Sequence, residues 1–208
     1  MRVILFGSPG SGKGTQAMLL AGSLSIRKIS LGDILREEVK KESNLGQEVK
    51  NYMERGALVP DELVSRVIEE NIGQEGFLLD GYPRNLNQAK KLDEILNKNN
   101  SDVDVVIYLD IDQQTIVDRL SNRRVCKSCG ANYHLVSLPS KNAGICDKCG
   151  SELTQRDDDD PEVIKTRWQV FSQEASKVLD FYQKKDKLIK VDGQGKIKEV
   201  FERIKNKL

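Results

Sequence analysis

The first stretch of the chain, Met1–Gln16, reads MRVILFGSPGSGKGTQ and guides the interpretation of everything that follows. Val3–Phe6 is an unbroken apolar run, which is typical of a strand buried on both faces. The glycines that come next let the backbone turn, so that successive amides can close around an anion. Apolar positions then recur in helical register, and the loop therefore ends on a helix N-terminus, which favours phosphate. Strand, glycine-rich loop and helix together predict a phosphate-binding P-loop.

One position departs from the common P-loop pattern G-x-x-x-x-G-K-[ST]. Gly7, Gly12 and Lys13 match the pattern, but Gly14 follows the lysine and the hydroxyl residue, Thr15, comes one place later. Direct ligation of a metal by that hydroxyl is therefore left open. An ordinary glycine-rich turn is the alternative to a P-loop, and the agreement of loop, lysine and flanking elements argues against it.

Composition and charge exclude several classes of protein. A chain of 208 residues can bury a good core, as one domain with insertions or as two small domains. Lys and Arg total 33 and Asp and Glu total 32, so a net charge of +1 gives no global attraction to nucleic acid or membrane. No apolar stretch approaches the roughly 20 residues that span a bilayer. With no export signal ahead of the P-loop, we expect a cytoplasmic protein with reduced cysteines.

Strands alternate with helices along most of the chain, which predicts a parallel sheet with right-handed crossovers. Buried strands are expected near residues 3–6, 28–29, 76–80, 103–109 and 187–191. Residues 30–59 form a small helical insertion, in which Asp33 is expected to cap a helix starting at Ile34. From Arg123 to Asp160 the helical period disappears, which marks a second insertion. A long helix to about Lys185 follows.

The four cysteines have the spacing of a tetrathiolate metal site. Two C-x-x-C pairs are formed by Cys126, Cys129, Cys146 and Cys149. Each pair presents two sulfurs from one tight turn, and together the pairs supply four ligands in tetrahedral geometry. Four protein ligands close the coordination shell, so we expect a structural Zn²⁺. Metal-free thiols and two disulfides are the alternatives, and iron or cobalt fit the same ligands.

Several arginines lie near junctions of the expected elements. They are Arg36, Arg84, Arg119, Arg123, Arg156 and Arg167. Arginine binds phosphate through two parallel hydrogen bonds, although a single arginine is usually a solvated surface group. Arginines that converge on a P-loop indicate transfer of a phosphoryl group between two anionic substrates. Asp33 and Asp80, at the sheet edge, are placed to hold Mg²⁺ through water. The single histidine, His134, is interpreted as a surface or ligand-contact residue.

Further stretches carry a family resemblance: Gly7–Thr15, Gly32–Arg36, Asp80–Arg84 and Gln155–Asp158. These correspond to a P-loop with glycine after the lysine, an acceptor-site motif, an Asp-Gly-Phe/Tyr-Pro-Arg signature and a lid exit. With the cysteine pairs, they make essentially the whole chain resemble the adenylate kinase family in its long, zinc-bearing form. The resemblance implies a P-loop NTPase-type α/β fold with a five-stranded parallel sheet. It also implies a monomer that transfers a phosphoryl group from Mg²⁺-bound ATP to AMP, giving two ADP.

The resemblance also implies domains and site residues. A core domain comprises residues 1–29, 60–121 and 160–208, a domain that binds the nucleoside monophosphate comprises 30–59, and a lid comprises 122–159. The residues that stabilise the transferring phosphoryl are Lys13, Arg123, Arg156 and Arg167. The ATP site comprises Gly10, Ser11, Gly12, Lys13, Gly14, Thr15, Arg119, Arg123, Tyr133, His134 and Gly195. The AMP site comprises Leu31, Arg36, Ala57, Leu58, Val59, Gly81, Arg84, Gln88, Arg156 and Arg167.

The identity of the acceptor depends on two of these residues. The Gln88 amide offers a donor and an acceptor that fit the edge of adenine, and such a site discriminates strongly. The family usually has Ser-Thr-Gly-Asp where this chain has Ser30-Leu31-Gly32-Asp33, so Leu31 removes a hydroxyl near the base. A UMP or CMP kinase is thus the first alternative, although such relatives typically carry asparagine in place of Gln88. The near-zero net charge argues against a nucleic-acid-binding zinc ribbon, and a second phosphate site at Arg84 argues against a nucleotide switch.

Overall fold

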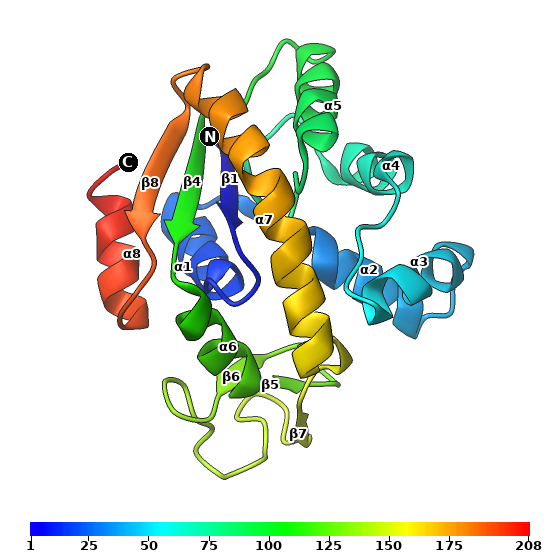
Figure 1. The fold of residues 1–208 in the computed structure, drawn as a ribbon, viewed down its shortest axis with the longest axis vertical. Helices are drawn as coiled ribbons and strands as arrows, with labels where there is room; N and C mark the ends of the chain where they lie inside the picture. Colours follow the sequence, from blue (N-terminus) through cyan, green and yellow to red (C-terminus); the bar gives the residue numbers. More distant parts are fainter.

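A five-stranded parallel sheet forms the centre of the computed structural model, which describes all residues from Met1 to Leu208 (Figure 1). The strands are β1 (Arg2–Gly7), β2 (Arg27–Ser30), β3 (Phe77–Asp80), β4 (Val105–Asp110) and β8 (Leu188–Asp192). Their order across the sheet is β2-β3-β1-β4-β8, and every neighbouring pair is parallel. The expected five-stranded parallel sheet is therefore confirmed.

Helices cover both faces of the sheet. The helices of the chain are α1 (Lys13–Leu24), α2 (Leu31–Lys40), α3 (Asn44–Glu54), α4 (Asp61–Asn71), α5 (Leu86–Asn97), α6 (Gln113–Ser121), α7 (Pro161–Gln183) and α8 (Ile197–Lys205). Side chains of a strand alternate between faces, so Val3 and Leu5 of β1 pack with α1 and α8, whereas Ile4 and Phe6 pack with α5 and α7. Burial on both faces explains the unbroken apolar run of β1.

Several helix starts follow from local sequence. The side chains of Asn85, Asp112 and Asp160 accept hydrogen bonds from the first-turn amides of α5, α6 and α7. These caps satisfy donors that the helix leaves unpaired. None of the helices combines the length and the apolar composition that crossing a bilayer requires.

Residues 30–59, called the helical insertion below, contain α2 and α3, which pack against each other. The expectation that Asp33 caps a helix starting at Ile34 was wrong. Helix α2 begins at Leu31, directly after β2, and Ser30 occupies the N-cap position. Asp33 instead lies in the first turn, where a carboxylate is favoured by the helix dipole, and it pairs with Arg36 at 2.5 Å.

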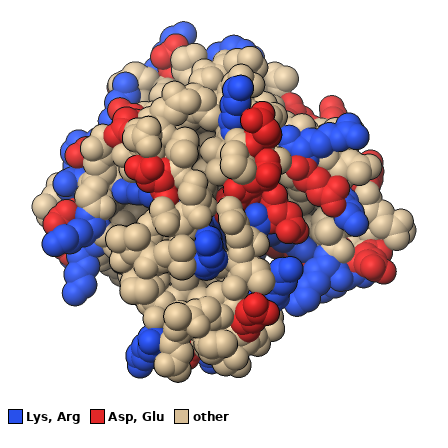
Figure 2. Space-filling view, turned by 60° about the horizontal axis from the view of Figure 1, so that its bottom comes forward, with Lys and Arg blue, Asp and Glu red and all other residues tan.

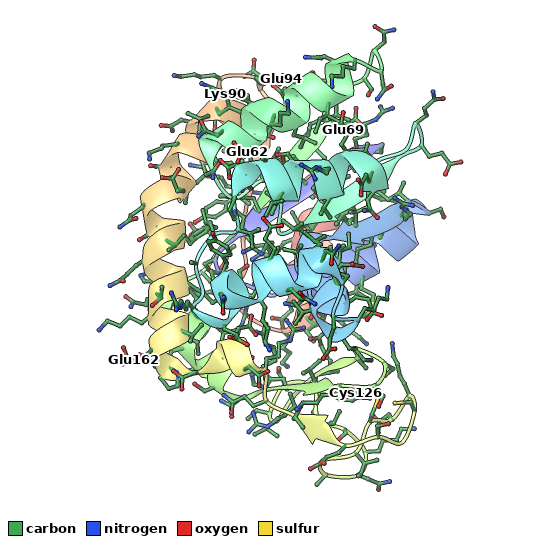
Figure 3. The ribbon with its side chains drawn as sticks, turned by 90° about the vertical axis from the view of Figure 1, so that its right-hand side faces the viewer. Glu62, Glu69, Lys90, Glu94, Cys126 and Glu162 are labelled. Carbon is green, nitrogen blue, oxygen red and sulfur yellow. The ribbon has the colours of Figure 1, made fainter.

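Residues 122–159, called the cysteine-bearing insertion below, contain a three-stranded antiparallel sheet in the order β6-β5-β7. The strands are β5 (Arg123–Cys126), β6 (Asn132–His134) and β7 (Leu153–Thr154), and a short 3₁₀ helix, η1 (Asp157–Asp159), follows. These strands are too short to show an alternating pattern, which is why the sequence did not predict them. Figure 3 shows Cys126 in this insertion, at the end of the molecule opposite α5. Helix α7 runs from there to the top of the central sheet (Figure 1).

Candidate active site

The P-loop joins the buried end of β1 to the start of α1. Gly10 and Gly12 have φ angles of 78° and 89°, which glycine adopts without steric cost, and Gly12 is the N-cap residue of α1. The ammonium of Lys13 curls back over the loop and donates to the carbonyl oxygens of Gly7 and Ser8, both at 2.7 Å. The loop thus has the predicted setting between a strand and a helix N-terminus, where free amides favour an anion.

Positive charges from other elements surround Lys13. Burial lowers the pKa of Lys13 to about 7. Asp80 opposes this shift, whereas the charges of Arg84, Arg167 and Arg123 add to it. The structure therefore gathers cations from the sheet edge, from α7 and from the cysteine-bearing insertion around the P-loop lysine. Such a group of like charges favours an anionic ligand.

Arg123 and Arg167 are held by two carboxylates next to them in space. Arg123 makes a two-pronged ion pair with Asp159, in which Nε lies 2.7 Å from Oδ2. Arg167 lies 2.9 Å from Asp158 and 3.6 Å from Asp159. Asp159 is only 1% exposed. These two aspartates position the arginines, and the sequence analysis missed the role of Asp159. The acidic run after Arg156 was the available signal.

Arg36 lies close enough to both Arg84 and Arg156 for its positive charge to lower their pKa values. Arg156 donates to the Asn132 side chain at 2.7 Å, and the Nε of Arg84 donates to the Gly81 carbonyl at 2.9 Å. Burial lowers the pKa of Arg156 to about 10, and the charge of Arg123 adds to the shift. The surrounding protein lowers the pKa of Arg84 to about 10 as well, although its side chain is open to solvent. Bound phosphate would relieve this repulsion.

Arg119 links three of the expected ATP-site segments. Its guanidinium, on α6, donates to the carbonyl of Ser11 in the P-loop at 3.2 Å. It also donates to the carbonyls of Gly193 and Gly195, in the loop between β8 and α8, at 2.9 and 3.5 Å. The structure therefore brings Ser11, Arg119 and Gly195 together beside the P-loop.

Tyr133 and His134 use their polar atoms within the cysteine-bearing insertion. The Tyr133 hydroxyl lies 3.5 Å from the sulfur of Cys146 and accepts a hydrogen bond from the Asp147 amide. His134 Nδ1 accepts from two backbone amides of the turn that follows it. Burial lowers the pKa of His134, and the nearby charge of Arg119 adds to the shift, so His134 lies near the Arg119 end of the site.

The expected acceptor residues come together around a small, mostly apolar cavity. Its lining consists of Leu31, Leu35, Leu58, Val59, Val64, Arg84 and Gln88. Leu31 and Gln88 are each 1% exposed. The residues come from α2, from the segment before α4, from α4, from the turn before α5 and from α5. Five other residues expected at the acceptor site do not line this cavity: Arg36, Ala57, Gly81, Arg156 and Arg167.

Of the two expected magnesium carboxylates, Asp80 lies at the end of β3 and Asp33 lies in the first turn of α2, just after the neighbouring strand β2. Asp80 ends β3, and its Oδ2 is 3.5 Å from the point where a Cβ on Gly14 would stand, so it lies against the start of α1. Asp33 is half exposed and pairs with Arg36 and Lys28. Desolvation opposes ionisation of Asp33, but the charges of Arg36 and Lys28 prevail and lower its pKa to about 2. Both carboxylates can accept hydrogen bonds from the water shell of Mg²⁺.

The four cysteine sulfurs form one compact cluster in the second insertion. All of them lie within 4.8 Å of one another, and none forms a disulfide. Cys126 and Cys149 sulfurs are 3.4 Å apart, and those of Cys129 and Cys146 are 3.5 Å apart. Tetrahedral zinc with bonds of about 2.3 Å places its sulfurs about 3.8 Å apart. The donor set and its spacing therefore fit a zinc ion.

Fold and site together define the class of protein. The P-loop at the edge of a parallel sheet faces arginines from the turn after β3, from the cysteine-bearing insertion and from α7. Arg36 of the helical insertion acts electrostatically on two of these arginines, Arg84 and Arg167. Kinases that transfer a phosphoryl group between two anionic substrates have such an arrangement. Figure 2 shows basic and acidic side chains interspersed over the end that carries the cysteine-bearing insertion. The cationic group is thus a local feature of the site rather than a broad basic face.

Comparison with known proteins identifies the family. The sequence model described as "Adenylate kinase" matches residues 5–187. A protein named adenylate kinase from Caldanaerobacter subterraneus is 45% identical over all of this chain and 96% of its own length. Another, from Methanocella arvoryzae, is 50% identical over 96% of this chain and 94% of its own. A third, from Fervidobacterium nodosum, is 44% identical over similar shares, 96% and 94%. The chain belongs to the adenylate kinase family.

Proposed function

We infer that the protein catalyses the reversible transfer of the γ-phosphoryl group of Mg²⁺-bound ATP to AMP, giving two molecules of ADP. Family membership and the names of the relatives support this activity. The observation that carries it is the convergence of arginines from three elements on the P-loop lysine, together with a cavity lined by Gln88 and by one of these arginines, Arg84. A nucleotide hydrolase needs no second phosphate site or base cavity, whereas a kinase of nucleoside monophosphates needs both.

Each of the two insertions contacts one of the two substrates. The helical insertion is the AMP-binding domain, the cysteine-bearing insertion is the lid over ATP, and the remaining residues, 1–29, 60–121 and 160–208, form the core. Arg36 and Arg84 bind the phosphate of AMP, because Arg84 lines the cavity and Arg36 is close enough for its charge to lower the pKa of Arg84. Backbone atoms near Val59 and Gly81 frame the acceptor base. The apolar wall that includes Leu31, Leu58 and Val59 contacts the base, and Gln88 reads its edge.

Phosphoryl transfer requires both charge stabilisation and the exclusion of water. Lys13 follows the transferring group, and Arg123, Arg156 and Arg167 neutralise the charge that develops on its oxygens. Arg119, with the P-loop residues from Gly10 to Thr15 and the loop at Gly195, holds ATP. Tyr133 and His134 border the ATP site from the lid. Closure of the lid removes water that would otherwise accept the phosphoryl group.

Two metals assist in different ways. Mg²⁺ arrives with ATP and keeps several of its waters, which Asp33 and Asp80 can orient. The four cysteines would hold Zn²⁺ with no coordination position left open, so the ion would stabilise the lid and take no part in the chemistry. All four cysteines are free thiols, which fits a cytoplasmic enzyme. We propose that it acts as a monomer, because one chain supplies the whole site.

Removing the zinc is expected to unfold the lid while the central sheet survives. The lid has a buried cluster of only a few residues besides its sulfurs, so metal binding supplies much of its folding free energy. After treatment with a strong chelator, amide hydrogen exchange should become fast between Cys126 and Cys149 and remain slow in β1 and β4. A Cys126→Ser variant should respond little to the chelator. Unchanged exchange and an unchanged melting curve after metal removal would contradict the structural role.

Replacing Arg123 by alanine is expected to lower kcat far more than it weakens ATP binding. Arg123 is held by buried Asp159, and its charge acts on Lys13 of the P-loop. We expect it to act on charge that develops on the phosphoryl group only in the transition state. We expect kcat to fall about 100-fold, with the Kd of ATP changed by less than about threefold. Arg124→Ala is the matched control, because Arg124 donates only to backbone carbonyls. Equal losses in kcat and ATP affinity would make Arg123 a ground-state binder.

The affinity for Mg²⁺-bound ATP is expected to fall as the pH rises above 7. The pKa of Lys13 is about 7 without ligand, and the phosphates of ATP raise it, so binding takes up a proton in this range. The Kd should therefore increase with pH by up to about tenfold per unit. Calorimetric titration in buffers of different ionisation enthalpy measures the proton uptake directly. A Kd that is flat from pH 7 to 9 would contradict this assignment.

A panel of acceptors tests the proposed activity. The protein is mixed with ATP, Mg²⁺ and, in separate reactions, AMP, CMP, UMP or GMP, and the products are separated by ion exchange. We expect rapid formation of ADP from AMP alone, which would show that Leu31 is compatible with adenine. Preferred conversion of another monophosphate would overturn the acceptor, and no transfer to any of them would overturn the activity.

A further inference from the structure

The carboxylate of Asp61, which is not among the expected site residues, forms a hydrogen bond with the side chain of Gln88, the residue proposed to recognise the acceptor base. Oδ1 of Asp61 accepts a hydrogen bond from Nε2 of Gln88 at 2.7 Å and another from Nδ2 of Asn85 at 2.9 Å. On its other side, the Gln88 Oε1 accepts from the backbone amide of Arg84 at 2.8 Å. Asp61 is the first residue of α4, and Gln88 lies in the first turn of α5. Figure 3 shows these two helices side by side.

These contacts determine which way the Gln88 amide faces. The carboxylate of Asp61 can only accept and the Arg84 amide can only donate, so the nitrogen of Gln88 must face Asp61 and its oxygen must face Arg84. A flipped amide would place its oxygen against a carboxylate and its NH₂ against an N–H group. With Gln88 1% exposed, water is not at hand to relieve either conflict.

The anchoring leaves the amide able to make one hydrogen bond of each kind. Nε2 retains one N–H and Oε1 retains one lone pair, and the side chain lines the acceptor cavity. In that orientation the free N–H suits the N1 acceptor of adenine, and the free lone pair suits the 6-amino group. A 6-oxopurine presents the opposite pattern, with an oxygen at position 6 and a hydrogen on N1. A flipped amide would fit that pattern instead.

We propose that Asp61 is a positioning residue that fixes the Gln88 amide and thereby makes the acceptor site select a 6-aminopurine over a 6-oxopurine. The proposal rests on the proposed function, because it concerns the base of the same acceptor. Asp61 itself does not line the cavity and acts through Gln88. Asn85 supports the arrangement. Its side-chain oxygen accepts a hydrogen bond from the backbone N–H of Gln88, and its side-chain nitrogen donates to the same oxygen of Asp61 that binds the Gln88 side chain.

The test compares AMP with IMP, which differ only at position 6 and N1 of the base. We expect Asp61→Ala to lower kcat/KM for AMP and to narrow the AMP-to-IMP ratio of kcat/KM by at least about tenfold. Asp61→Asn retains the shape and offers either a donor or an acceptor, so it should narrow the ratio by a smaller factor, about threefold. The KM for ATP should not change in either variant.

Glu62→Ala is the matched control. Glu62 is an exposed carboxylate next to Asp61 in the first turn of α4, so the variant loses the same charge at the same helix end (Figure 3). Its AMP-to-IMP ratio should equal that of the unmodified protein. A merely structural role of Asp61 would lower the melting temperature and kcat for both acceptors without altering their ratio. Such an unaltered ratio in Asp61→Ala would overturn the proposal, and if that variant does not fold, Asp61→Asn decides by the same criterion.

Failure of this inference can be distinguished from failure of the proposed function. If the unmodified protein does not phosphorylate AMP, the proposed function is wrong and the acceptor site with it. If it phosphorylates AMP and the Asp61 variants keep the same preference over IMP, the activity stands and only the role of Asp61 is wrong.

Discussion

Lys13→Met is expected to lower kcat by about 1,000-fold, which is the upper range for loss of one group that stabilises transition-state charge. Methionine preserves the length of the side chain and removes its charge. The ammonium sits at the mouth of the P-loop on the carbonyls of Gly7 and Ser8, from which it can move onto the transferring phosphoryl. Single-turnover quench-flow measurements with saturating ATP and AMP separate this chemical step from product release.

The same variant should fold at least as stably as the original protein at neutral pH. Folding lowers the pKa of Lys13 to about 7, so the protonated lysine disfavours the folded state below that pH. This penalty is relieved as the pH rises from 7 toward the ordinary pKa of lysine, and methionine carries none of it. Lys198→Met, on the exposed face of α8, is the control and should change neither kcat nor stability. A kcat within tenfold of the original would remove Lys13 from the proposed chemistry.

Asp159→Ala is expected to lower the free energy of unfolding by about 3 kcal/mol, because it leaves buried positive charge without a partner. The Asp159 carboxylate is 1% exposed, binds Arg123 through two hydrogen bonds and lies 3.6 Å from Arg167. Without it these arginines repel each other, and Arg123 loses the contact that orients it. We therefore expect kcat to fall as well, and urea denaturation followed by circular dichroism measures the stability change.

Asp157 provides the matched control for this prediction. It lies two positions away in the same acidic run but is exposed and forms no ion pair. Asp157→Ala should leave both stability and kcat nearly unchanged, and Asp159→Asn should fall between the two alanine variants. If Asp159→Ala is as stable as Asp157→Ala, the buried pair with Arg123 does not hold this part of the site together.

Local sequence predicted those features whose partners are close along the chain. The P-loop is encoded by glycines and a lysine within a few positions of a buried strand, and the metal cluster is encoded by two cysteine pairs. Spacing alone fixes their geometry, so the structure matches both. The helix caps that the structure shows at Asn85, Asp112 and Asp160 are also local, because each side chain accepts a hydrogen bond from an amide two or three positions further along the chain.

Partners that meet only through tertiary packing were not predictable in this way. Asp159 reaches Arg123 across 36 positions, and Asp61 reaches Gln88 across 27. The sequence around Asp159 or Asp61 does not indicate which residue its carboxylate will bind. Each pair forms only because two elements pack together in the fold, β5 with η1 in the first case and α4 with α5 in the second. The expectation that Asp33 caps a helix was wrong for a related reason. The end of β2 leads directly into α2, so the helix begins before the residue that best resembles a cap.

Following the γ-phosphoryl group of ATP shows directly whether AMP or water is the acceptor. The protein is incubated with Mg²⁺, AMP and ATP labelled in the γ-phosphate, and the products are resolved within the first turnovers. We expect label in the β-phosphate of ADP, one labelled ADP for each ATP consumed, and almost no label in inorganic phosphate. Label that appears mainly in inorganic phosphate, whether or not AMP is present, would mean that water is the acceptor and that the protein is not a kinase of AMP.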